Sequence, residues 1–121
     1  MIKCGGGDDG LYEDRKFQQN IQGALANGIQ VGVYFYSGAS NAREAYDEAS
    51  YCISLIRDYQ ITYPVAFDWE LDGDYDSVTE ACETFCNVIS SYGYQPMVYS
   101  NRNRWYNNFD GEKIASKYKV W

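Results

Sequence analysis

The stretch Pro64-Val65-Ala66-Phe67-Asp68-Trp69-Glu70 is an apolar run that ends in two carboxylic acids one residue apart. Its length and composition predict a buried β-strand. Because side chains alternate along a strand, we expect Asp68 and Glu70 to share one face, with Phe67 and Trp69 on the other. The Cβ atoms of the two acids would then lie about 6–7 Å apart. Such a pair suits acid–base chemistry, since burial and like-charge repulsion keep one acid protonated while the other stays ionised.

Helix-like and strand-like segments alternate on both sides of this strand. Helices are predicted over residues 14–27, 41–59 and 77–92, strands over residues 31–36 and 96–100, a loop or short helix over 101–109, and a last strand from Tyr118. Gly28 and Gly93 are expected to end two of the helices. Asn41 with Glu44, and likewise Ser77 with Glu80, have the spacing of a capping box. Strands separated by helices of this length predict right-handed βαβ units and a parallel sheet.

A faint internal repeat supports this organisation. The segments Gly28-Ile29-Gln30-Val31-Gly32-Val33-Tyr34 and Gly93-Tyr94-Gln95-Pro96-Met97-Val98-Tyr99 carry Gly, Gln, Val and Tyr at the same offsets. The repeat predicts that Tyr34 and Tyr99 stand at equivalent heights on their strands. It suits either a barrel or a doubly wound sheet.

The composition limits the chain to one domain or part of one, and it excludes several classes of partner. With 121 residues and a net charge of −7, the chain lacks the basic surface that nucleic acids and anionic membranes attract. It has no run of about 18 apolar residues, so no membrane-spanning segment is expected. Residues 1–9 lack the apolar core of a signal peptide, so no signal peptide is expected in this chain.

The cysteines and the absence of histidine narrow the chemistry further. Cys52, Cys82 and Cys86 fall on apolar faces of predicted helices, where a free cysteine packs as a small hydrophobe, so no disulfide is predicted. With no histidine and no Cys-x-x-Cys pair, we expect neither a zinc site nor another cofactor. The acids of loop 72–76 lack the ligand pattern of a calcium-binding EF-hand. Acid–base work therefore falls to carboxylates or tyrosine.

Binding sites in parallel α/β sheets lie at the carboxyl ends of the strands. The side chains predicted at that edge are Tyr34, Tyr36, Asp68, Glu70, Tyr99 and Asn101. Trp105, just beyond the edge, is either a platform that stacks on sugar rings or a hydrophobic lid. The tyrosines could instead pack at a barrel mouth, and the two acids could be a solvated strand end or a helix cap. A carboxylate pair at a strand end is the arrangement that glycoside hydrolysis requires.

Several motifs occur in a fixed order along the chain. They are Gly-Val-Tyr-Phe-Tyr-Ser (32–37), Glu-Ala-x-x-Glu-Ala (44–49), Tyr-Pro-Val-Ala-Phe-Asp-Trp-Glu (63–70) and Gly-Tyr-x-Pro-Met-Val-Tyr-Ser-Asn (93–101), with Asp-x-x-Phe-x-x-Asn-x-x-x-Ala (14–24) before them. Together they resemble glycoside hydrolase family 25, the lysozymes of the N-acetylmuramidase type found in phage endolysins and bacteria. The resemblance runs essentially from end to end.

This resemblance implies an α/β fold, a parallel (β/α) barrel of the irregular glycosidase type. It implies Glu70 as the general acid, and Asp68 as the partner that stabilises the intermediate or orients the acetamido group of the substrate. Tyr34 and Tyr99 match aromatic positions that line the groove. The implied reaction cleaves the β-1,4 bond between N-acetylmuramic acid and N-acetylglucosamine in peptidoglycan glycan strands of the bacterial cell wall.

The chain also departs from the family pattern. The first strand of the family, with its Asp-x-Ser-x-x-Gln-Gly motif, and its last strands, with a Trp-Gln-Tyr segment, have no counterpart in this sequence. We therefore expect residues 1–121 to be a partial catalytic domain, with only residues 1–3 left for its first strand and Cys4-Gly5-Gly6-Gly7 as a loop. Five strands with broken outer edges could pair with a second copy.

An incomplete site is expected to show little or no muramidase activity by itself, because misplacement of about 1 Å costs about a hundredfold. The alternative function is an inactive fragment that binds glycan or associates with itself. A third is an unrelated barrel hydrolase that uses the same acids on chitin or cellulose.

Overall fold

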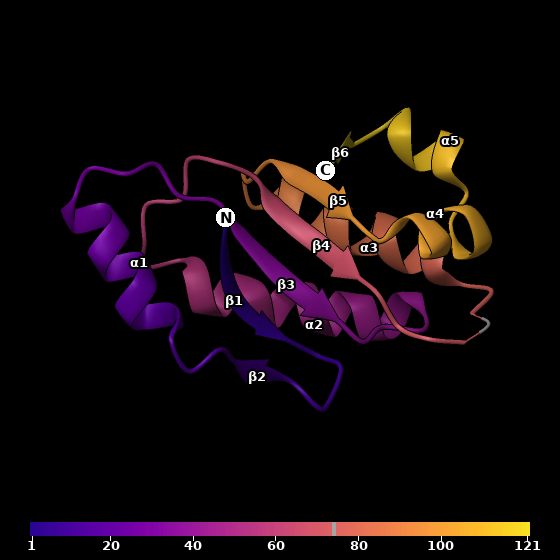
Figure 1. Ribbon diagram of the computed structural model, residues 1–121, viewed down its shortest axis with the longest axis horizontal. Coiled ribbons are helices and arrows are strands. Elements are labelled where there is room, and N and C mark those ends of the chain that lie inside the picture. The colour runs from indigo at the N-terminus through magenta and orange to yellow at the C-terminus, as the bar shows by residue number, and fades with distance from the viewer. Residues whose placement is uncertain (74) are drawn as a thin grey trace.

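The computed structural model describes residues 1–73 and 75–121, and within them six strands form one mixed sheet (Figure 1). The strands are β1 (Ile2–Gly6), β2 (Tyr12–Glu13), β3 (Val33–Ser37), β4 (Val65–Trp69), β5 (Pro96–Tyr99) and β6 (Lys119–Val120). The helices are α1 (Phe17–Ala26), α2 (Ala42–Ile56), α3 (Val78–Ser91), α4 (Arg102–Asn108) and α5 (Gly111–Ala115). The strand order is β2-β1-β3-β4-β5-β6, and every pairing is parallel except that of β1 with β2. The α/β fold and the parallel core of the sheet are confirmed.

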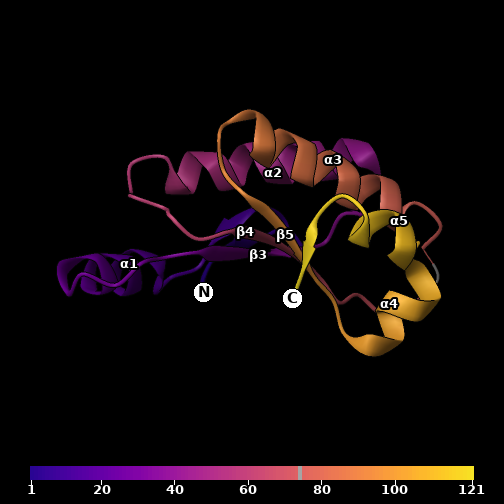
Figure 2. The same cartoon turned by 90° about the horizontal axis from the view of Figure 1, so that it is seen from above.

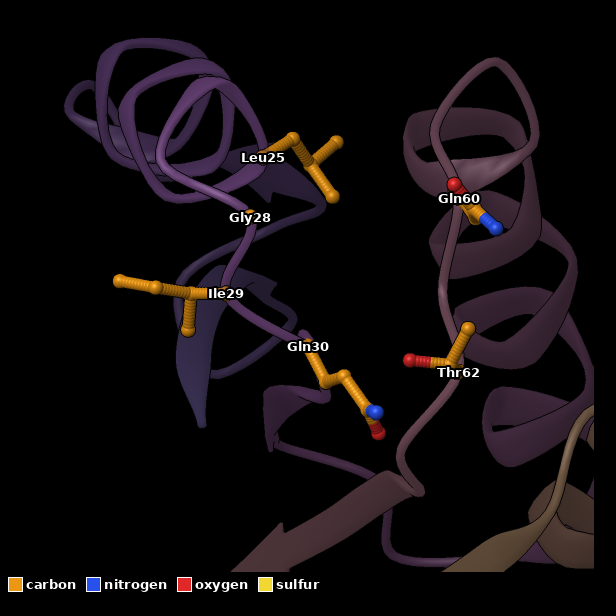
Figure 3. Close-up of a pocket in the computed structure, with 6 residues that line it drawn as sticks. All are labelled: Leu25, Gly28, Ile29, Gln30, Gln60 and Thr62. Atoms are coloured by element: carbon orange, nitrogen blue, oxygen red, sulfur yellow. The ribbon is translucent and has the colours of Figure 1, made fainter.

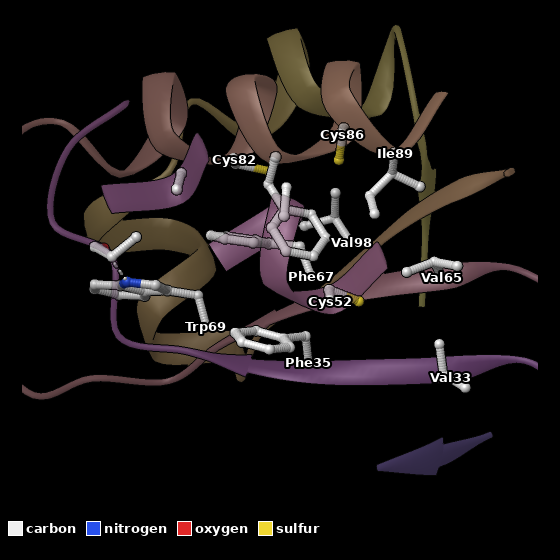
Figure 4. Close-up of a cluster of buried hydrophobic side chains, with 14 of the residues drawn as sticks. Val33, Phe35, Cys52, Val65, Phe67, Trp69, Cys82, Cys86, Ile89 and Val98 are labelled. Atoms are coloured by element: carbon white, nitrogen blue, oxygen red, sulfur yellow. Dashed lines mark hydrogen bonds between the residues drawn. The ribbon is translucent and has the colours of Figure 1, made fainter. Parts of the chain in front are cut away.

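Helices α2 and α3 lie side by side over one face of the sheet (Figure 2). The side chains between these layers are fully or almost fully buried (Figure 4), and they include Val33, Phe35, Cys52, Val65, Phe67, Trp69, Cys82, Cys86, Ile89 and Val98. Burying one large apolar side chain contributes about 1.5–3 kcal/mol. This layer is therefore the main source of stability, and it holds β4 in the middle of the sheet.

All five residues of β4 are buried, although only alternate ones face the helices. Phe67 and Trp69 belong to the core under α3, and Phe67 lies 5.1 Å from Phe85 between ring centroids. The alternation of side chains along a strand then places Asp68 on the opposite face. The core side predicted for Phe67 and Trp69 is therefore confirmed.

Strand β1 is longer than predicted. It runs through Gly6, whereas its glycines were expected to form a loop. A β-carbon at Gly6 would lie 2.8 Å from the carbonyl oxygen of Tyr36, so β1 and β3 can approach closely only with glycine there. The glycines therefore mark tight packing of the strand, and the loop prediction for residues 4–7 is wrong.

Two short elements were not predicted. Strand β2 has two residues and helix α5 has five, and neither is long enough to show a hydrophobic period. The described residues therefore contain six strands where five were expected. Asp74, part of the predicted polar loop, lies outside the described residues.

The predicted helix signals have mixed outcomes. Asn41 caps α2, because its side-chain oxygen accepts a hydrogen bond from the Glu44 backbone N–H at 2.9 Å. Ser77 makes no side-chain capping hydrogen bond to α3, so that prediction is wrong. Gly28 and Gly93 end helices as predicted, with φ of 71° and 88°, a conformation that glycine adopts without strain.

All four cysteines are buried and free, as the helical pattern predicted for Cys52, Cys82 and Cys86. The Sγ atoms of Cys4 and Cys52 lie 3.7 Å apart, which is too far for a disulfide bond. No helix in the described part of the chain is long and apolar enough to cross a membrane.

Candidate active site

The two candidate acids lie at the carboxyl end of the central strand. Asp68 is the fourth residue of β4, and Glu70 follows the strand directly. In the sheet, Asp68 is level with Tyr36 of β3 on one side and with Tyr99 of β5 on the other. The structure thus brings four of the predicted site residues, Tyr36, Asp68, Glu70 and Tyr99, to one edge.

Asp68 is a buried acid without a full set of hydrogen bonds. Its side chain is 5% exposed, and its Oδ1 has no hydrogen-bond partner among the described residues. The pKa of Asp68 is raised to about 8, because burial and the neighbouring Glu70 carboxyl together outweigh the opposing charge of Lys3. At neutral pH the pair therefore holds a proton on Asp68. An unpartnered buried carboxyl oxygen is costly, and such costs are typical of functional sites.

The tyrosines around Asp68 do not stand as the internal repeat predicted. Tyr34 is level with Ala66, two residues before Asp68, whereas Tyr99 is level with Asp68 itself. The prediction of equal heights for Tyr34 and Tyr99 is therefore wrong. The register of a strand is set by its pairing with its neighbours, and the distance from a preceding glycine does not fix it.

Trp121 contacts both of these tyrosines from the far end of the chain. Its ring centroid lies 6.4 Å from that of Tyr34 and 5.1 Å from that of Tyr99. The indole is 55% exposed, so one of its surfaces remains open to solvent. The uncovered face of the sheet therefore carries aromatic rings beside the buried acid. Sequence reasoning treated Trp121 only as the end of a strand and missed this contact.

Lys3 is a second residue that sequence reasoning missed. Its Nζ lies 5.1 Å from the ring centroid of Tyr36 and 5.3 Å from that of Tyr12. Burial raises the pKa of Tyr36, as do the charges of Glu70 and Asp68. Lys3 thus supplies positive charge on the acidic side of the site. The sequence feature that could have pointed to Lys3 was its position as the one basic residue in an otherwise apolar strand.

Asn101 and Trp105 make contacts that stabilise α4. The Asn101 side chain accepts a hydrogen bond from the Arg104 backbone N–H at 2.9 Å, which caps the helix. Trp105 stacks on Phe109 with 5.4 Å between ring centroids, and Phe109 meets Trp69 edge-on at 5.8 Å. The contacts of Trp105 are those expected of a hydrophobic lid, whereas the cap at Asn101 was not predicted. Contact of either residue with a substrate stays a prediction.

Two cavities in the described part of the chain lie away from the acid pair. One of about 260 Å³ opens between the end of α1 and the segment before β4 (Figure 3), and it is lined by Leu25, Gly28, Ile29, Gln30, Gln60 and Thr62. It lies near the amino ends of β3 and β4, and none of its lining residues is titratable. A groove of about 500 Å³ along α4 and α5 is lined by Trp105 and Tyr106. Neither Asp68 nor Glu70 lines either of these cavities.

Comparison with known proteins places this geometry in context. The family model described as glycosyl hydrolases family 25 matches residues 1–121. A comparison with curated proteins gave no significant match.

Solved structures show the same arrangement of helices and strands. A structure of the CTP1L endolysin matches with a TM-score of 0.81 and 24% identity, over 98% of this chain and 41% of that chain. The modular autolysin LytC from Streptococcus pneumoniae matches with a TM-score of 0.77 and 27% identity, over 88% of this chain and 27% of that chain. The Cpl-1 endolysin, in complex with a peptidoglycan analogue, matches with a TM-score of 0.80 and 24% identity, over 100% of this chain and 35% of that chain. This chain thus spans less than half the length of each of these three.

Proposed function

The chain belongs to family 25 of the glycosyl hydrolases, and from this membership we propose that the protein is a peptidoglycan hydrolase. The bond cleaved is the β-1,4 bond between N-acetylmuramic acid and N-acetylglucosamine. The observation that carries the proposal is the buried carboxyl of Asp68 beside Glu70, on an open sheet face with aromatic side chains. Structures of LytC and Cpl-1 with peptidoglycan ligands support the choice of substrate.

In the proposed mechanism, Glu70 protonates the oxygen of the leaving sugar. Asp68 holds a proton in the free protein, because burial raises its pKa to about 8. Positive charge that develops on the sugar ring favours the ionised form of Asp68. The reactive form is therefore the minor one in which Glu70, which is less buried and follows the strand, already carries the shared proton and Asp68 is ionised before the glycosidic bond breaks. Ionised Asp68 stabilises the oxocarbenium-like charge, or orients the acetamido group.

The aromatic side chains give the glycan strand a surface to bind. Tyr34, Tyr36 and Tyr99 lie on the same face as Asp68, and their rings suit stacking on the apolar faces of sugar rings. Asn101 and Trp105 extend this surface toward α4. The proposed partner is therefore a peptidoglycan glycan strand, and the proposed place of action is the bacterial cell wall.

We propose further that the six-stranded sheet is an arc of an irregular (β/α) barrel, with residues 1–121 forming part of the catalytic domain. The structures matched above are longer than this chain, which supports this reading. At one side of the sheet, Val120 and Trp121 are 44% and 55% exposed. This edge also supports the second candidate, a module that binds glycan or pairs with another copy without catalysis.

Analysis of reaction products tests the proposal. The chain is incubated with an equal amount of purified peptidoglycan fragments, and the reducing ends are identified by mass spectrometry. At the low yield expected of a partial site, the proposal predicts N-acetylmuramic acid at the new reducing ends, loss of these products in Glu70→Gln, and their retention in Glu112→Gln, which changes an exposed acid on α5.

The other outcomes separate the alternatives. N-Acetylglucosamine at the reducing ends, or unchanged cleavage by Glu70→Gln, would contradict the proposed reaction. Binding without cleavage, together with a dimeric mass in solution, would favour the non-catalytic module. Cleavage of chitin or cellulose in place of peptidoglycan would indicate an unrelated specificity.

A further inference from the structure

A second buried carboxyl lies beneath the candidate site. Glu48 of α2 is only 3% exposed, and both of its oxygens accept hydrogen bonds. Its Oε1 accepts from the Ser37 hydroxyl at 2.5 Å, and its Oε2 accepts from the Gly38 backbone N–H at 2.7 Å. Glu48 therefore holds the segment that directly follows β3.

The hydrogen bonds continue from this segment to the strand that carries the acids. Ser37 Oγ accepts a hydrogen bond from the Ala39 backbone N–H at 3.1 Å. The Ala39 carbonyl oxygen in turn accepts from the indole Nε1–H of Trp69 at 2.9 Å, drawn as a dashed line in Figure 4. Trp69 stands between Asp68 and Glu70. A continuous chain of hydrogen bonds thus joins Glu48 to the end of β4.

Two glycines beside Glu48 leave no room for a side chain of their own, although Glu48 also lines a cavity of about 290 Å³ with Gly7 and Glu44. A β-carbon at Gly7 would lie 2.8 Å from Glu48 Cδ. A β-carbon at Gly38 would lie 2.7 Å from the carbonyl carbon of Gly7. Two glycines, at the ends of β1 and β3, therefore allow the backbone to close around the acid.

We propose that Glu48 is a positioning residue for the acid pair: through Ser37 and Ala39 it fixes the indole of Trp69 and, with it, the end of β4. The catalytic meaning of this role rests on the function proposed above for Asp68 and Glu70. The connection from Glu48 to the Trp69 indole does not depend on that function, because it is present in the folded chain without substrate.

The protonation state of Glu48 sets the direction of these hydrogen bonds. Ionised Glu48 accepts both bonds, whereas protonated Glu48 must donate one, and the Ser37 hydroxyl can rotate to accept it. The pKa of Glu48 is raised to about 7, because burial and the carboxyls of Glu44 and Asp8 together outweigh the hydrogen bonds from Ser37 and Gly38, which lower it. The acids facing it are therefore Glu44 of its own helix and Asp8 of the loop after β1. Because bonded groups polarise one another, a reversal at Ser37 changes the field at the Trp69 N–H.

The indole N–H resonance of Trp69 reports on this link in the 121-residue chain. In ¹H–¹⁵N spectra, the variants Trp105→Phe and Trp121→Phe identify the Trp69 signal by elimination. The wild-type signal is expected to move with a midpoint near pH 7, the value set by Glu48. Glu48→Gln is expected to abolish this step, because the amide can donate to Ser37 and accept from Gly38 in the manner of a protonated acid. Asp68→Asn is expected to leave the step in place.

Glu48→Ala removes the link and is the complementary variant. It is expected to move the Trp69 signal upfield and to speed exchange of its proton with solvent. An unchanged Trp69 signal in Glu48→Ala, or a step near pH 7 that survives in Glu48→Gln, would overturn the proposal. If Glu48→Ala does not fold, the pH titration of wild type against Glu48→Gln still decides the matter.

Kinetics separate this proposal from the proposed function. Where hydrolysis is measurable, Glu48→Ala should lower kcat at least about tenfold with little change in KM, and Glu48→Gln should restore most of it. Equal loss in both variants would contradict a positioning role. Loss of the Trp69 link with hydrolysis intact refutes only the role of Glu48, whereas an intact link without hydrolysis refutes only the catalytic assignment.

Discussion

Asp68 and Tyr99 stand level with each other on neighbouring strands β4 and β5. Side chains at level positions of neighbouring strands point to the same face, so the phenol ring lies beside the buried carboxyl. This relationship places an aromatic surface next to an acid whose pKa is raised to about 8. A sugar ring that stacks on Tyr99 would therefore reach the acid pair.

Stability should fall as the pH rises through the range in which the buried acids ionise. Asp68 has a folded pKa of about 8 against an ordinary value of 3.8, so the folded state binds its proton more tightly than the unfolded state does. Its contribution is complete below about pH 4 and is lost as the pH rises toward 8. Urea unfolding at pH 5 and pH 8.5 should show a higher free energy of unfolding at pH 5.

The variant Asp68→Asn isolates this effect. It should reduce the difference in unfolding free energy between the two pH values by about 1 kcal/mol or more. Glu48, whose pKa is raised to about 7, acts in the same direction and should account for part of the remaining difference. A wild-type chain that is more stable at pH 8.5 than at pH 5 would contradict the buried, protonated state of both acids.

Glycine substitutions should have opposite effects at two positions. Gly6→Ala places a β-carbon 2.8 Å from the Tyr36 carbonyl oxygen, so it should destabilise the sheet by about 1–3 kcal/mol. Gly23→Ala lies in α1, where a β-carbon meets no atom within 4 Å, and it should stabilise the chain by about 0.5–1 kcal/mol. Thermal unfolding of both variants measures these two changes in stability. Similar destabilisation by both would show that β1 and β3 do not pack closely at Gly6.

The two predicted helix caps provide a second matched pair. Asn41→Ala removes the hydrogen bond to the Glu44 N–H and should cost about 1 kcal/mol. Ser77→Ala should cost much less, because the Ser77 side chain makes no capping bond. Urea midpoints of the two variants test this difference. An equal loss at Ser77 would mean that its hydroxyl caps α3 in solution.

Aromatic contact with the glycan is testable at Tyr99. Tyr99→Ala should weaken binding of a peptidoglycan tetrasaccharide by about 1 kcal/mol, or about fivefold in Kd, through loss of ring stacking. Tyr92→Ala is a suitable control, since Tyr92 is 66% exposed at the end of α3 and comes before the amino end of β5, whereas Tyr99 ends that strand. Isothermal titration calorimetry gives both constants. Equal affinities in the two variants would remove Tyr99 from the binding surface.

Much of the fold could be predicted from local patterns in the sequence. The apolar run before Asp68 indicated a buried strand, and the Asn41–Glu44 spacing indicated the start of α2, because strand burial and helix capping depend on neighbouring residues. The glycines of β1 were misread, because the close approach of Tyr12 and Tyr36 that requires them comes from distant segments. For the same reason, the relative heights of Tyr34 and Tyr99 could not be read from a repeat.

Sequence reasoning identified the two candidate acids but missed several of the residues around them. Asp68 and Glu70 were evident because two acids end an apolar strand. Glu48 stands at helical spacing between Ala45 and Cys52, within the apolar stripe of α2, and an acid in such a stripe was a readable signal of burial. Its partners come from the end of β3, however, and only the folded structure brings them together.

The central proposal is that Asp68 and Glu70 form a glycan-cleaving acid pair that shares a proton. Carbon-13 NMR of the Asp68 carboxyl across the range from about pH 3 to about pH 9, with and without a peptidoglycan tetrasaccharide, tests it most directly. The free chain should show Asp68 titrating near pH 8, and the saccharide, which excludes water from the site and brings no positive charge, should not lower that midpoint. A midpoint near the ordinary value of 3.8, with or without the saccharide, would contradict the proposal.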